Sequence, residues 1–207
     1  MAAETAARLL WLEALQRLAD GAAHEIKNPL NGLAVNLEVV RSRAERGGAD
    51  VATVARFATA AAEELQRTAA LVEALLAVSR PARAPVDLWM VLQPLVALYG
   101  AIAAASGGTL VLERPAESMG ATEADPAAVR LAMTSALAGV AYDEATVRCS
   151  LETRDGAVMM SVRGAPATAP AGDVRAVIER AGIGVELLSD GLRLRFAPAG
   201  GGARTTV

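Results

Sequence analysis

Apolar residues recur at alternating intervals of three and four along two long stretches of the first 80 residues. The first stretch carries them at Leu12, Leu15, Ala19, Ala22, Ile26, Leu30, Leu33, Leu37 and Val40. The second carries them at Val54, Ala58, Ala61, Leu65, Thr68, Val72, Leu75 and Ser79. This spacing is typical of the seam of a coiled coil or a four-helix bundle, so two long helices are predicted.

The two predicted helices form a hairpin that cannot cover its own apolar stripe. Gly47 and Gly48 separate the helices, Asp50 is a good N-cap for the second helix, and the Ser79-Arg80-Pro81 segment ends it. Two such hairpins would cover the stripe by pairing into a four-helix bundle, so a homodimer is expected. We assign residues 1–80 to this hairpin.

Shorter elements follow in residues 81–207, which we assign to a second domain. Helices are expected at residues 88–106, 126–142 and 172–181. Strands are expected at residues 109–113, 146–153, 157–163, 184–188 and 191–196. Helices alternating with a mostly antiparallel sheet predict a two-layer α/β sandwich, so the whole chain is predicted to be α+β.

Composition excludes several classes of function. The formal net charge is −3, and basic residues neither cluster nor interleave with aromatics, so nucleic-acid binding is not expected. The single cysteine, Cys149, excludes a disulfide framework within the chain. Charges interrupt the first helix, and no uninterrupted apolar run reaches the roughly 18 residues that span a bilayer. We expect a soluble, cytoplasmic protein that does not enter a membrane.

The only histidine of the chain, His24, lies within the segment AHEIKNPLNGL of the first predicted helix. The neighbouring stripe positions are Ala22 and Ile26, so His24 is expected to point away from the stripe. Glu25 can fix the tautomer of the imidazole and accept its proton, which leaves the other ring nitrogen free as a nucleophile. Asn28 lies one turn later on the same face, within reach of a group carried by the imidazole.

Pro29 interrupts the helix directly after this group of polar residues. It removes one backbone donor and clashes with the carbonyl of Glu25, at a cost of roughly 3 kcal/mol, which predicts a kink. An exposed imidazole beside a carboxylate suits phosphoryl transfer, because the imidazole attacks in line and forms a labile N–P bond. We predict that His24 carries a phosphoryl group. The alternative is an ordinary surface histidine beside an unrelated glutamate.

The segment Ala23–Leu33 resembles the H-box of bacterial sensor histidine kinases, and residues 10–80 resemble their dimerisation and histidine-phosphotransfer domain. The resemblance implies that His24 is the phosphoacceptor and that Glu25 is its acid/base partner. It also implies that Asn28 positions the phosphoryl group, or the water that removes it from a response regulator.

The same resemblance implies a response-regulator receiver domain as the partner of the hairpin. The receiver domain would dock on the bundle beside His24, on a surface that includes Lys27 and Asn31. It would bring its own Mg²⁺, so no metal ion is expected to be held by this chain.

Residues 81–207 resemble the ATP-binding domain of the same family only in part. Two asparagines of the family hold Mg²⁺ and phosphates, and their positions are Ser135 and Gly139 here. The family's Asp-x-Gly-x-Gly box should follow Arg163, but residues 162–168 contain no acidic residue, and its later Gly-x-Gly box is reduced to Gly172. The resemblance therefore implies a degenerate ATP site and no nucleotide cofactor.

A phosphate-carrying hairpin joined to a domain without an ATP site predicts a relay. The leading hypothesis is a histidine phosphotransferase, which takes the phosphoryl group from one receiver domain onto His24 and passes it to another. It resembles the dimeric histidine phosphotransferases of phosphorelays. Two alternatives remain open: a histidine kinase with a divergent ATP site and autokinase or phosphatase activity, or a non-catalytic pseudokinase that binds a receiver domain.

Overall fold

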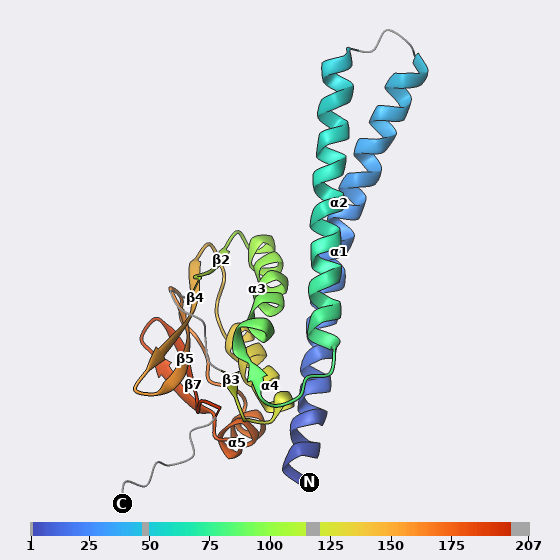
Figure 1. Ribbon diagram of the computed structural model, residues 1–207. Helices are drawn as coiled ribbons and strands as arrows, with labels where there is room; N and C mark the ends of the chain where they lie inside the picture. The colour runs from blue at the N-terminus through green and yellow to red at the C-terminus, as the bar shows by residue number, and fades with distance from the viewer. Residues whose placement is uncertain (1, 47–49, 115–120, 200–207) are drawn as a thin grey trace, which may run out of the picture.

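Two antiparallel helices form a long hairpin at the N-terminal end of the computed structural model, which describes residues 2–46, 50–114 and 121–199 (Figure 1). They are α1 (Ala2–Arg46) and α2 (Val51–Ser79). The carboxylate of Asp50 caps α2 by accepting hydrogen bonds from the backbone N–H groups of Ala52 and Thr53 at 3.2 Å. The two helices are thus confirmed, and the predicted Gly47-Gly48 turn lies outside the described residues.

Helix α1 extends well beyond the end of α2, and its N-terminal half packs against the second part of the chain. Its buried residues there are Ala7, Trp11, Ala14, Leu18 and Ala22. They belong to the same cluster of buried side chains as the core of the α/β part, which α1 reaches through α3, α4 and α5. The helix continues through Pro29 without a break.

Several large apolar residues of the predicted stripe remain exposed on the hairpin of this single chain. The buried residues of α2 are Ala61, Thr68, Leu71, Ala74 and Val78. Large apolar side chains of the stripe remain 40 to 55% exposed, namely Leu12, Leu30, Leu37, Leu65 and Val72. Alanines supply many of the residues that pack within the chain, alongside Leu18 and Leu71, whereas the other leucines named here stay exposed.

The α/β part consists of a five-stranded sheet with three helices on one face. Its elements are β1 (Val86–Asp87), α3 (Leu88–Ala105), β2 (Thr109–Leu112), β3 (Ala121–Thr122), α4 (Pro126–Ala138), β4 (Thr146–Arg154), β5 (Ala157–Arg163), α5 (Gly172–Arg180), β6 (Gly184–Leu188) and β7 (Gly191–Phe196). The strand order is β2-β4-β5-β7-β6, with β2 parallel to β4 and the other pairs antiparallel. The predicted two-layer α/β sandwich is therefore confirmed.

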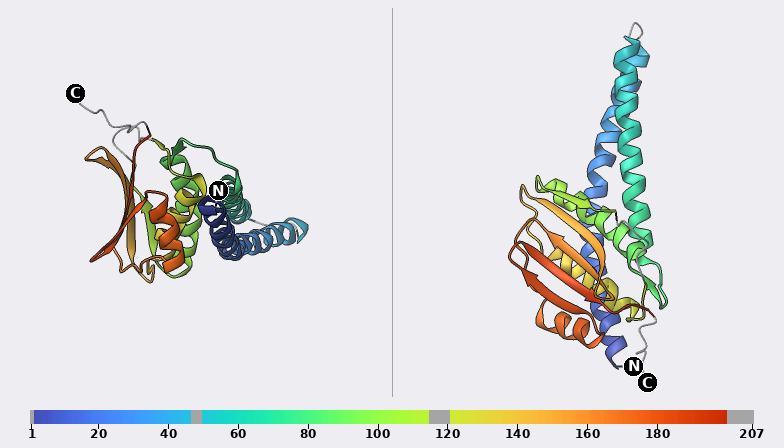
Figure 2. Two further views of the ribbon diagram at one scale, coloured as in Figure 1. Left: turned by 90° about the horizontal axis from the view of Figure 1, so that it is seen from below. Right: turned by 60° about the vertical axis from the view of Figure 1, so that its left-hand side comes forward.

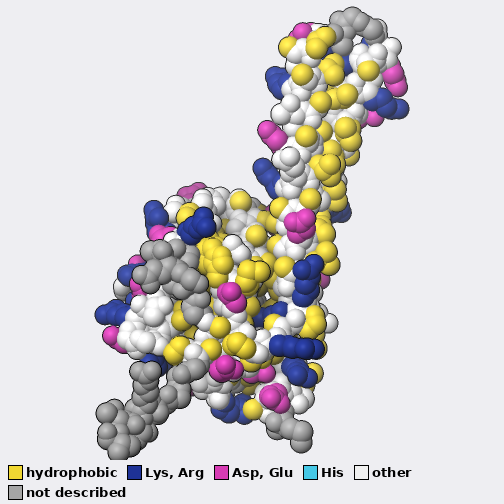
Figure 3. All heavy atoms as spheres, in the orientation of Figure 1, with side chains coloured by type: hydrophobic (Ala, Val, Ile, Leu, Met, Phe, Trp, Pro, Cys, Tyr) yellow, Lys and Arg dark blue, Asp and Glu magenta, His cyan; other side chains and the backbone are white. Residues whose placement is uncertain are grey.

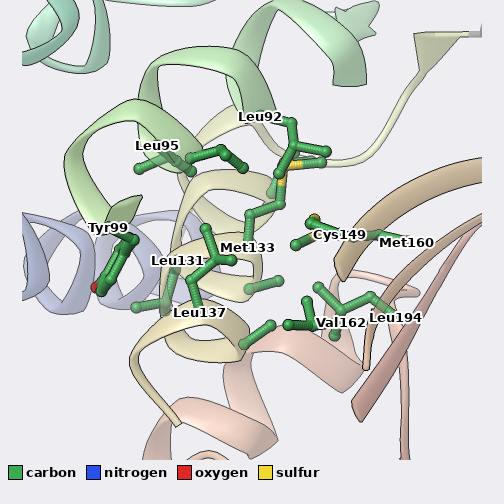
Figure 4. Packing of buried hydrophobic residues seen from close by; sticks show 14 of the residues in the cluster. Leu92, Leu95, Tyr99, Leu131, Met133, Leu137, Cys149, Met160, Val162 and Leu194 are labelled. Atoms are coloured by element: carbon green, nitrogen blue, oxygen red, sulfur yellow. The ribbon is translucent and has the colours of Figure 1, made fainter. Parts of the chain in front are cut away.

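The helical layer lies between the sheet and the hairpin, as the view from below shows (Figure 2). Apolar side chains of α3 and α4 meet those of the inner sheet face in the core (Figure 4). Residues with no exposed surface there include Leu92, Leu95, Met133, Leu137, Cys149, Met160, Val162 and Leu194. Among the described residues, only α3 is long and apolar enough to span a membrane by length and composition. One face of that helix forms part of this core.

Two predictions for the α/β part are wrong in detail. Helix α4 ends at Ala138 rather than near residue 142, because the next residues pair with a loop instead. The backbone N–H of Thr168 donates to the carbonyl of Gly139 at 2.9 Å, and Val140 forms a bridge with Ala167. The two-residue strands β1 and β3, which pair with each other, were not predicted, since two residues carry no periodicity.

Candidate functional site

His24 is exposed on α1 and lines a groove of about 900 Å³ between the hairpin and α3. Helix α1 contributes His24, Glu25, Asn28 and Pro29 to the lining of this groove. Helix α2 contributes Glu64, Arg67, Ala70 and Leu71, and α3 contributes Ala97, Ala101, Ala104 and Ala105. We call this space the His24 groove. Its α3 wall consists of alanines, whose short side chains leave the groove open.

The predicted site residues of α1 differ in their exposure. His24 and Asn28 are exposed and share the groove one helical turn apart, while Glu25 is half-buried and Pro29 is buried. Among the described residues, no hydrogen bond joins Glu25 to the His24 imidazole, because adjacent positions on a helix point in different directions. The predicted contact between these two side chains is therefore not made in this structure, although both line the groove.

Lys27 and Asn31 are exposed on α1 but lie outside the lining of the groove. They are accessible to a partner that approaches α1, and they do not contribute to the space into which His24 opens. The structure therefore separates the predicted partner-binding residues from the predicted chemical ones.

Two charged residues of α2 line the groove and were not singled out from the sequence. The Nε atom of Arg67 lies 4.0 Å from the Oε2 atom of Glu64. That oxygen is buried and accepts no hydrogen bond from any described residue. A Cβ atom at Gly32 would lie 3.7 Å from Cγ of Glu64, so α1 and Glu64 are in contact here. The sequence signal was the antiparallel pairing of the helices, which brings residue 64 opposite residue 32.

Residues 14–83 match the His Kinase A (phospho-acceptor) domain family. The match covers most of α1, including His24, all of α2 and the residues that follow it. The hairpin is a His Kinase A phospho-acceptor domain. This confirms for the hairpin the resemblance to bacterial sensor histidine kinases. No curated protein matches the chain at the sequence level.

Solved structures similar to this chain include kinases and a phosphotransferase. The histidine kinase AdeS of Acinetobacter baumannii is 12% identical over 85% of this chain and 98% of its own, with a TM-score of 0.40. A bacterial phosphotransferase is 14% identical over 89% of this chain and 95% of its own, with a TM-score of 0.38. The histidine kinase ThkA, in complex with the response regulator TrrA, is 18% identical over 90% of this chain and 62% of its own, with a TM-score of 0.40.

Helix α1 of the phospho-acceptor domain packs beside α4. Helix α4 and its C-cap carry Ser135 and Gly139, the two positions that correspond to the family's asparagines. Thr134 and Ser135 of α4 share a space of about 300 Å³ with α1 and two tyrosines. The α1 residues that line it are Ala14, Arg17 and Leu18. The Tyr142 hydroxyl donates to the carbonyl of Leu137 at 2.8 Å beside this space.

At Gly139, the second of these positions, the backbone of a neighbouring loop fills the space that a side chain would need. A Cβ atom there would lie 2.7 Å from the carbonyl oxygen of Thr168 and 3.2 Å from that of Ser135. A side chain at this position requires the backbone to move. Within the described ranges, no group of three or more His, Cys, Asp and Glu residues is arranged to hold a metal ion.

Proposed function

We propose that the protein is a histidine phosphotransferase that relays phosphoryl groups between response-regulator receiver domains through phospho-His24. One observation carries the proposal: the only histidine of a His Kinase A phospho-acceptor domain is exposed and lines an open groove. An accessible imidazole nitrogen is the nucleophile that phosphoryl transfer between proteins requires.

The chemical step is a displacement at phosphorus. A ring nitrogen of His24 attacks the phosphorus of the receiver's aspartyl phosphate, so the N–P bond forms as the P–O bond breaks and the aspartate carboxylate leaves. Glu25 accepts the proton from the imidazole once its side chain turns toward His24, and Asn28 orients the phosphoryl oxygens from one turn further along α1. The reverse displacement delivers the group to a second receiver domain, and each receiver domain supplies its own Mg²⁺.

The receiver domain would dock on the hairpin around the His24 groove. Lys27 and Asn31 are exposed on α1 beside it and offer a charge and an amide to this partner. A bound receiver would also face the alanine wall of α3, since that wall lines the same groove as His24.

A relay rather than an autokinase is supported by the surroundings of α4. An asparagine at Gly139 would collide with the carbonyl of Thr168, and α1 packs beside Thr134 and Ser135. Gly139 therefore has no room for a side chain, and Thr134 and Ser135 line a small space that α1 also lines. We propose that residues 81–207 act as a degenerate domain that does not bind ATP.

A homodimer completes the proposed active form. Hydrophobic side chains run along the exposed side of the hairpin (Figure 3). The large apolar residues of the hairpin that are at least 40% exposed include Leu12, Leu30, Leu37, Leu65, Val72 and Leu76. A second hairpin would cover them in a four-helix bundle made from residues 1–80 of each chain, and the dimer would act in the cytoplasm.

The proposal is tested by offering two phosphoryl donors to the purified full chain. Receiver domains labelled with ³²P acetyl phosphate should transfer label to the wild type and not to His24→Ala. Labelled ATP should transfer none. Absence of transfer from every receiver domain in a genome-wide panel contradicts the relay, and labelling by ATP assigns the protein to the kinases instead.

A further inference from the structure

Arg67 is the only lysine or arginine among the described residues that line the His24 groove. It lines the groove from α2, whereas His24 and Asn28 line it from α1. Its side chain is 70% exposed, so the guanidinium is free to move toward a ligand. The other charged groups of the lining are the carboxylates of Glu25 and Glu64.

Phosphorylation of His24 makes this groove strongly anionic. A phosphoryl group carries close to two negative charges at neutral pH and three acceptor oxygens. Two carboxylates already line the same space, and like charges repel the incoming group. A guanidinium offers paired N–H donors whose geometry matches phosphoryl oxygens, and such charge-assisted hydrogen bonds are strong. The groove therefore needs a cation at the time of transfer, and Arg67 supplies one.

The contact between Arg67 and Glu64 is loose enough to be exchanged. The closest approach is 4.0 Å, which is longer than a hydrogen bond, so the pair holds the guanidinium only by charge. The Oε2 atom of Glu64 is buried and accepts no hydrogen bond within the described ranges. The backbone of Glu64 is meanwhile fixed, because its carbonyl accepts the Thr68 hydroxyl at 2.9 Å. The Glu64 side chain is 29% exposed and that of Arg67 is 70% exposed, so a largely buried carboxylate holds a more mobile guanidinium at the groove.

We infer that Arg67 binds the phosphoryl group carried by His24 and that Glu64 holds the guanidinium at the groove until the group arrives. The inference rests on the proposed phosphorylation of His24. It assigns a phosphoryl-binding residue to α2, in addition to the α1 residues of the H-box. On phosphorylation, Arg67 exchanges the Glu64 carboxylate for the phosphoryl oxygens.

A small phosphoryl donor tests this without any receiver domain. Phosphoramidate supplies the same electrophile: the His24–P bond forms, the P–N bond of the donor breaks, and ammonia leaves with the proton. The reaction is followed on the full chain by the 80 Da gain in intact mass, and the phosphorylated peptide is mapped. In Arg67→Ala the rate should fall about tenfold or more, because the groove then lacks its cation. Arg67→Lys should recover part of the rate.

Two further variants separate phosphoryl binding from an effect on folding. Arg56→Ala removes another arginine of α2, which stacks 5.1 Å from the ring centroid of Phe57, and should react as the wild type does. Glu64→Gln removes the carboxylate that holds the guanidinium at the groove, so its rate should fall, but by less than that of Arg67→Ala, because the guanidinium itself is still present. Circular dichroism confirms that each variant is helical.

Three results overturn the inference. A rate for Arg67→Ala equal to that of the wild type excludes Arg67 from phosphoryl binding. If Glu64→Gln slows the reaction as much as Arg67→Ala does, the two residues stabilise the structure and do not bind the phosphoryl group. If neither the wild type nor His24→Ala gains mass while a known histidine phosphocarrier does, the proposed phosphoacceptor fails, and the inference fails with it.

Discussion

The carbonyl oxygen of Thr168 lies 2.7 Å from the point where a Cβ atom on Gly139 would stand. This contact exists because the loop after β5 pairs with the end of α4, through Thr168 and the Val140–Ala167 bridge. The loop therefore occupies the place of a side chain at this position of α4. Gly139 is the second of the two positions that correspond to the family's asparagines.

Gly139→Asn is expected to destabilise the fold without creating an ATP site. The backbone at Gly139 has ordinary helical angles, so the cost is steric, and overpacking of this kind costs about 1–3 kcal/mol. Urea denaturation should show this decrease in the free energy of unfolding. Gly172→Ala is the matched control, since no atom lies within 4 Å of its added Cβ, and it should leave the stability unchanged. Calorimetric binding of ATP by Gly139→Asn would contradict the account.

Arg130 connects the hairpin to the α/β part. Its guanidinium lies 5.8 Å from the ring centroid of Trp11 and donates a hydrogen bond to the carbonyl of Arg80. Partial burial lowers the pKa of this group, but a guanidinium stays charged at neutral pH. Arg130→Ala should lower the free energy of unfolding by about 1–2 kcal/mol, whereas Arg83→Ala, an exposed arginine of the linker, should not. Equal free energies of unfolding for the two variants would contradict a stabilising role of Arg130 between the hairpin and the α/β part.

The exposed leucines of the hairpin are expected to form a dimer interface. Leu65 is 55% exposed and Leu76 is 56% exposed on α2. A charge at either position would be buried without a partner in a four-helix bundle, so Leu65→Glu or Leu76→Glu should yield a monomer in light scattering. Leu187→Glu provides the control, because Leu187 is 50% exposed on β6. A wild-type protein that is monomeric at micromolar concentration would contradict the prediction.

Cys149 is expected to be inert in the folded protein. Its side chain has no exposed surface, and burial raises the pKa of the thiol to about 12. A raised pKa keeps the group protonated below that value, so almost no thiolate exists at pH 8 to react. Ellman's reagent should label Cys149 only in denaturant. Stoichiometric labelling of the native protein within minutes would show that the core opens readily.

Much of the fold is encoded in periodicity that the sequence displays directly. The strands of residues 157–163, 184–188 and 191–196 have the predicted bounds, because alternating apolar residues and Gly or Asp turns mark their ends. The end of α4 was not predictable in this way. Residues up to Tyr142 are compatible with a helix, and the competing partner, Ala167, lies 27 residues beyond Val140.

The candidate site was predictable only on the helix that carries the motif. His24 and Asn28 follow from local spacing, since a helix fixes which neighbours share a face. Glu64 and Arg67 lie on the other helix, and their place depends on the register of the hairpin. The direct contact of Glu25 with His24 was expected from proximity in sequence, but adjacent helical positions diverge.

The central claim is that His24 passes phosphoryl groups between receiver domains, and a complete relay tests it most directly. One receiver domain is labelled with ³²P, freed of its donor, and mixed with a second, larger receiver domain that can be resolved from the first. Label should reach the second receiver only when the wild-type protein is added, and not with His24→Ala. Label that is released as inorganic phosphate, or that reaches the second receiver equally with His24→Ala, would contradict the account.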